Sequence, residues 1–99
     1  MKLHELKILH NYLIDVSLGT KTFELRKNDR DYQVGDLIRF IDKDYADRDY
    51  KLFHKNDVEP YIDENQLYRI TYVLKDKGVF GLDKDYCILA IKKLEIKEN

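Results

Sequence analysis

Three side chains with complementary chemistry lie close together in the first third of the chain, at Lys21, Glu24 and Arg26. Arg26 carries a permanent planar cation, which suits a phosphate group or the edge of a base. Glu24 can accept a hydrogen bond from an exocyclic amine such as N4 of cytosine. Together with Lys21, they predict a polar site that holds a single nucleotide or nucleoside.

The same three side chains leave two other interpretations open. In the first they are catalytic, because a lysine desolvated beside a carboxylate can activate water as a general base. Amide hydrolysis would also need an oxyanion stabiliser, which the sequence does not identify, and alternation along a strand would turn Lys21 away from Glu24. In the second, Glu24 and Arg26 form only a same-face ion pair on a sheet, with Lys21 in solvent.

Further side chains near this stretch could complete a binding site. From Lys21 to Arg30 the sequence has four basic and two acidic residues. Lys27 and Arg30 are therefore candidates for phosphate contacts at the rim of the site. Tyr12 or Tyr72 could stack on a base.

Length and composition limit the class of protein. The 99 residues suffice for a single domain over residues 1–99, and the net charge of −1 argues against a general nucleic-acid coat. One cysteine, Cys87, and three scattered histidines predict no disulfide, no metal and no cofactor, and Cys87 is expected in the core. The charged N-terminus is unlike a signal peptide and no apolar run approaches membrane-spanning length, so we expect a cytoplasmic protein without a membrane partner.

Hydrophobic periodicity predicts a small mixed α+β barrel of five strands and one early helix. The helix is expected over Asn11–Leu18, with Asn11 as its N-cap and Gly19 just past its end. The expected strands are Leu3–Leu9, Lys21–Arg26, Asp36–Asp42, Leu67–Lys75 and Tyr86–Lys93.

Alternation within these strands predicts which side chains face the core. Phe23 and Leu25 are expected to face inward from the second strand. Tyr72 is expected on the same face as Tyr68 and Ile70 in the fourth strand. His4 shares the apolar side of the first strand, where we expect a histidine bonded to the backbone.

The segment Asp44–Gln66 differs from the rest of the chain, with seven acidic and three basic residues. An irregular segment of this length in a small domain is typical of a functional loop. It is expected to form a lid, a solvated surface excursion pinned by a few aromatic side chains, or the contact surface of a phage-type adaptor that binds a protein partner.

The pattern formed by Gly19, Lys21, Glu24 and Arg26 resembles the G-x-K-x-x-E-x-R signature of ASCH domains, which belong to the PUA-like superfamily. Longer blocks are similar to a small bacterial and phage ASCH branch of unknown function. These blocks are HELKIL at residues 4–9, KTFELRKNDRDYQVGD at 21–36, ITYVL at 70–74 and FGL at 80–82. The resemblance covers most of the chain outside Asp44–Gln66.

This resemblance implies a PUA-like barrel of five to six strands, with the N-terminal helix closing one mouth and a cleft between helix and barrel. It implies RNA or a modified nucleoside as the ligand. One branch of the family hydrolyses N4-acylated cytosine nucleosides with a lysine, a threonine and a glutamate. The lysine falls on Lys21, the threonine position holds Glu24, and the glutamate has no counterpart that can be placed. An amidohydrolase acting on N4-acylated cytidine is the alternative that the resemblance implies.

Overall fold

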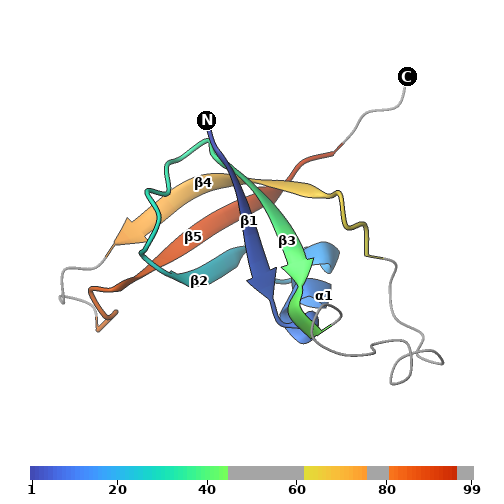
Figure 1. Ribbon diagram of the computed structural model, residues 1–99, viewed down its shortest axis with the longest axis horizontal. Coiled ribbons are helices and arrows are strands. Elements are labelled where there is room, and N and C mark those ends of the chain that lie inside the picture. Colours follow the sequence, from blue (N-terminus) through green and yellow to red (C-terminus); the bar gives the residue numbers. More distant parts are fainter. Residues whose placement is uncertain (45–61, 76–80, 96–99) are drawn as a thin grey trace.

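The computed structural model of the protein describes residues 1–44, 62–75 and 81–95, which form five strands and one helix (Figure 1). Within these ranges no helix is long and apolar enough to cross a membrane. The elements are β1 (Leu3–Ile8), α1 (His10–Leu18), β2 (Phe23–Lys27), β3 (Leu37–Asp42), β4 (Leu67–Lys75) and β5 (Tyr86–Lys93). All six lie where periodicity predicts them, within one or two residues at each end.

The five strands form one curled sheet in the order β1-β3-β4-β5-β2. β1 runs parallel to β3, whereas the other neighbours are antiparallel. The sheet has the shape of a half barrel, with β1 and β2 as its two edges and α1 beside the end of β3 (Figure 1). The α+β class and the small mixed barrel expected from the sequence are therefore confirmed at this level.

The core lies on the concave side of the sheet and under α1. Alternate residues of β1, β3 and β5 are buried there, as the period of two requires. Cys87 is fully buried, and burial raises the pKa of its thiol. The buried apolar residues are Leu6, Ile8, Leu13, Val16, Tyr32, Ile38, Phe40, Tyr68, Ile70, Cys87, Leu89 and Ile91.

The expected orientation of β2 is wrong, because the strand is turned over relative to the prediction. Phe23 and Leu25 are 49% and 52% exposed, whereas Glu24 is only 5% exposed. Phe23 and Leu25 lie opposite Ala90 and Ile88 of β5, so they form apolar cross-strand pairs on the outer face. The two apolar residues of β2 therefore pack against apolar neighbours on the outer face, and the face that carries Glu24 and Arg26 is directed inward.

The start of α1 also differs from the prediction. The helix begins at His10, and its N-cap residue, Leu9, makes no side-chain capping bond, so Asn11 is not the cap. The carboxylate of Asp44 instead accepts from the backbone N–H of His10 at 3.1 Å. A side chain distant in sequence therefore satisfies a free amide of the first turn. Gly19 ends the helix at φ 81°, the left-handed conformation expected there.

A bulge in β4 changes the face on which Tyr72 lies. The pairing with β5 shifts between Ile70 and Tyr72, so the alternation that buries Tyr68 and Ile70 does not continue to Tyr72. Tyr72 is 60% exposed, and Val73 packs against the core instead. The prediction that Tyr72 shares the buried face is therefore wrong.

His4 is buried as expected, but its partner is a carboxylate and not the backbone. Its Nε2 lies 2.8 Å from Oδ2 of Asp36, which is itself 3% exposed. Asp36 also accepts from the backbone N–H groups of Lys2 and Gln33, each at 3.0 Å. Burial opposes ionisation of Asp36, but these hydrogen bonds and the charge of His4 outweigh it and lower the pKa of Asp36 to about 2.

This low pKa predicts a loss of stability in acid. The folded state binds the Asp36 proton more weakly than the unfolded chain does. The ionised Asp36 therefore contributes its full share to the free energy of unfolding above the ordinary pKa of 3.8. The free energy of unfolding is expected to fall as the pH drops from about 4 towards 2. Urea midpoints measured across this range should fall less steeply for Asp36→Asn than for the wild type. Parallel curves for the two proteins would contradict the assignment to Asp36.

Candidate functional site

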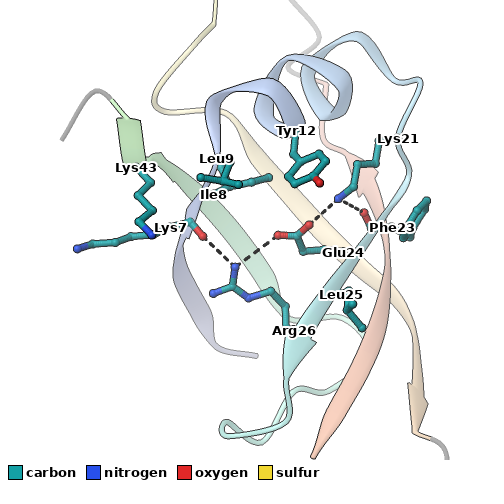
Figure 2. A pocket seen from close by; sticks show the side chains of 10 residues that line it. All are labelled: Lys7, Ile8, Leu9, Tyr12, Lys21, Phe23, Glu24, Leu25, Arg26 and Lys43. Carbon is teal, nitrogen blue, oxygen red and sulfur yellow. Dashed lines mark hydrogen bonds and ion pairs between the residues drawn. The ribbon is translucent and has the colours of Figure 1, made fainter. Parts of the chain in front are cut away.

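A cleft of about 530 Å³ lies between the two edges of the half barrel, beside the first turn of α1. One side is formed by the end of β1 and by Tyr12 of α1. The other side is formed by Lys21 and the edge of β2, and Lys43 lies beyond the end of β3 (Figure 2). The complete lining is Lys7, Ile8, Leu9, Tyr12, Lys21, Phe23, Glu24, Leu25, Arg26 and Lys43.

The carboxylate of Glu24 lies in the middle of this cleft and has a cation on each side. Lys21 Nζ is 2.5 Å from its Oε1, and Arg26 Nη1 is 3.5 Å from its Oε2 (Figure 2). The Glu24 side chain is only 7% exposed, compared with 16% for Lys21 and 25% for Arg26. The ion pair therefore lies mostly out of water, where charge interactions are stronger than on an open surface.

Lys21 reaches Glu24 because it precedes β2 and is not part of it. The chain turns at Gly19, and the backbone N–H groups of Thr20 and Lys21 both donate to the Asp15 carbonyl at the end of α1. The strand alternation that would have separated Lys21 from Glu24 consequently does not apply. Lys21 Nζ also donates to the Phe23 carbonyl at 2.8 Å and lies 5.4 Å from the centre of the Tyr12 ring.

Arg26 connects the two edges of the sheet across the cleft. Its Nη1 donates to the backbone carbonyl of Lys7 on β1 at 2.8 Å, while its side chain originates from β2 (Figure 2). Arg30 makes a second bridge to the same edge, donating to the carbonyl of Glu5 at 3.3 Å. No ladder joins β1 to β2 in the sheet order, so these arginines hold the two edges together.

The structure brings four of the seven residues predicted for ligand binding to the cleft. The four that line it are Tyr12, Lys21, Glu24 and Arg26, and the other three predicted residues lie outside it. Arg30 is engaged with β1, and the bulge places Tyr72 on an exposed part of β4. Lys27 shares the outer face of β2 with Leu25. These are the three predicted residues outside the cleft: Lys27, Arg30 and Tyr72.

Sequence reasoning missed Lys7 and Lys43 as cleft residues. Lys7 lies on the exposed side of an alternating strand, which is the ordinary place for a solvated lysine. Lys43 directly follows Asp42, where β3 ends. No local pattern distinguishes either one, because only the pairing of β1 with β3 brings them to the same place. Both are exposed, and their ammonium groups have no ion pair with any part of the chain that the structure describes.

The cleft therefore holds one carboxylate and four cationic side chains, Lys7, Lys21, Arg26 and Lys43. Within residues 1–44, 62–75 and 81–95, no group of three histidine, cysteine or acidic side chains is arranged to bind a metal ion. Most of Asp44–Gln66, for which a lid or a partner surface was predicted, lies outside the described residues. The site is thus defined by an ion-pair network and a positive rim.

A family model described as a domain of unknown function, DUF3850, matches residues 3–91 of the chain. The chain belongs to the DUF3850 family. No curated protein matches it. The DUF3850 match extends from the first residue of β1 into β5, so it includes every element of the sheet and every residue of the cleft. The cleft is therefore part of the DUF3850 domain itself.

Proposed function

We propose that this DUF3850 protein is a cytoplasmic, PUA-like ASCH domain that binds RNA or a modified nucleoside in the cleft. The buried carboxylate of Glu24, held by Lys21 and Arg26, is the observation that carries this proposal. A carboxylate with one face towards a cleft accepts hydrogen bonds from the exocyclic amine of a base.

The charges around Glu24 support an anionic ligand. Lys21 and Arg26 together carry one positive charge more than the single carboxylate, and the ammonium groups of Lys7 and Lys43 add to this excess at the rim. Positive charge at the mouth of a cleft attracts a phosphate, and Tyr12, which is 50% exposed, offers a ring on which a base can stack. A nucleotide satisfies all three features at once.

Affinity measurements with single nucleotides test this proposal. Lys21→Ala leaves Glu24 with one partner and removes a donor from the cleft, so we expect its affinity for cytidine monophosphate to fall about tenfold or more. Lys27→Ala removes an equal charge from the end of β2, outside the cleft, and serves as the control. Its affinity, measured by fluorescence or calorimetry, should stay within about twofold of the wild type. Equal losses in the two variants would contradict the site.

An amidohydrolase acting on N4-acylated cytidine is the second candidate, and the contact between Lys21 and Glu24 favours it. The pair offers a proton donor and an acceptor at 2.5 Å beside the cleft. However, Lys21 Nζ already donates to both Glu24 and the Phe23 carbonyl, so a substrate would have to displace one of these contacts to engage it. Incubation with N4-acetylcytidine followed by chromatography separates the two functions. Measurable nucleotide binding without turnover would exclude the hydrolase.

A further inference from the structure

The edge of β2 that faces the cleft carries main-chain groups as well as side chains. Hydrogen bonds between β2 and β5 involve even-numbered residues of this segment, since Ile91 N–H donates to the Thr22 carbonyl and Asn28 N–H to the Asp85 carbonyl. The ladder of an antiparallel pair alternates, so the N–H and C=O of odd-numbered residues point to the opposite edge. Leu25 is therefore a residue whose main-chain groups point away from β5 and towards β1.

The main chain of Leu25, and not its side chain, faces the cleft. The Leu25 side chain is 52% exposed on the outer face, and Figure 2 shows it directed away from Glu24. Leu25 nevertheless lines the cleft, so it does so with its backbone. The neighbouring outward carbonyl, that of Phe23, already accepts from Lys21 Nζ. Within the described part of the chain, the N–H and C=O of Leu25 meet no such partner.

We propose that Leu25 N–H and C=O, together with Glu24, select a base that has an exocyclic amine beside a ring nitrogen acceptor, as cytosine and adenine do. The Leu25 N–H donates to the ring nitrogen, and one amine hydrogen is donated to the Leu25 carbonyl. The second amine hydrogen is donated to Glu24. Uracil and hypoxanthine present a carbonyl and a ring N–H at these positions, so each would place acceptor against acceptor and donor against donor. This inference rests on the proposed nucleotide site and adds its base specificity.

Two pairs of nucleotides that differ in this edge test the selectivity. Cytidine and adenosine monophosphates are expected to bind about tenfold or more tightly than uridine and inosine monophosphates, respectively, because mismatched groups remain buried and unpaired. If the wild-type protein binds none of the four, the proposed function fails and this inference fails with it. If it binds all four equally, the proposed function stands and the base selectivity is overturned.

Removal of one N–H tests the role of Leu25 directly. In Leu25→Pro the lost N–H faces away from β5, so the ladder of the sheet stays intact. Cytidine monophosphate should then bind about tenfold more weakly. Lys27→Pro places a proline at the next residue of the same edge but outside the cleft. This control should stay within about twofold of the wild type.

A backbone ester provides a second variant should the proline variant fail to fold. Replacing Leu25 by its α-hydroxy acid removes the same N–H without fixing the backbone angle, and circular dichroism reports whether the sheet is retained. A folded ester variant that binds cytidine monophosphate as tightly as the wild type would overturn the assignment of Leu25. A tenfold loss, with uridine monophosphate unchanged, would support it.

Discussion

Replacement of Asp36 by alanine is expected to destabilise the protein by about 3–5 kcal/mol. Asp36 lies in the core and accepts from the His4 ring and from the backbone N–H groups of Lys2 and Gln33. Alanine removes all three acceptor contacts while the donors stay where they are, and a buried donor without a partner costs about 1–3 kcal/mol. Urea denaturation followed by circular dichroism measures the loss.

Two variants show whether this loss comes from the hydrogen bonds of Asp36. Asp29→Ala removes an exposed carboxylate from the turn after β2 and should change the free energy of unfolding by no more than about 0.5 kcal/mol. Asp36→Asn keeps one acceptor oxygen, so its stability should lie between those of Asp36→Ala and the wild type. If Asp36→Ala were as stable as Asp29→Ala, the network around His4 would not be a main support of the fold.

Replacement of Arg26 by alanine is expected to weaken nucleotide binding by roughly 10- to 100-fold, because hydrogen bonds to charged groups contribute about 1.5–3 kcal/mol each. The substitution removes a cation from the cleft and leaves Glu24 paired with Lys21 alone. It also removes the bond from Arg26 to the Lys7 carbonyl that connects the two edges of the sheet. Calorimetric titration with cytidine monophosphate measures the effect on affinity.

Arg30→Ala separates the two roles of Arg26. Arg30 also donates from the β2 side to a carbonyl of β1, but it does not line the cleft. We expect Arg30→Ala to lower the melting temperature slightly and to keep its affinity within about twofold of the wild type. An equal loss of affinity in both variants would mean that the connection between the edges, and not the guanidinium in the cleft, controls binding.

Periodicity located the strands and the helix because each buries one face, and burial leaves a period of two or 3.6 in the sequence. It failed at β2, where two polar residues face a cleft and two apolar residues pack on the outer face. It failed at Tyr72 because a bulge in β4 changes which residues face the core, although the alternation of residue types in the sequence continues without a break. Periodicity also gave no sign that Asp44 caps α1, since the backbone N–H that it accepts from, that of His10, lies 34 residues away in the sequence.

The candidate site was predictable where its residues are neighbours in sequence. Lys21, Glu24 and Arg26 belong to one stretch, and their chemistry alone indicated a polar site. Lys7 and Lys43 reach the cleft only because β1 pairs with β3, a contact that no local pattern records. The sequence also could not show that Arg26 lines the cleft and Arg30 does not. Both are arginines that donate to a carbonyl of β1, and they differ only in where they cross the gap between β1 and β2.

The order of the strands determines when the cleft can form during synthesis. β2 is made early, but its ladder partner is β5, the last strand of the sheet. While the ribosome is still adding the residues before Tyr86, the strand that carries Glu24 and Arg26 has no neighbour to hold it in the sheet. Pairing between segments so far apart in sequence is slow to nucleate. The wall of the cleft is therefore completed only after β5 has left the ribosome.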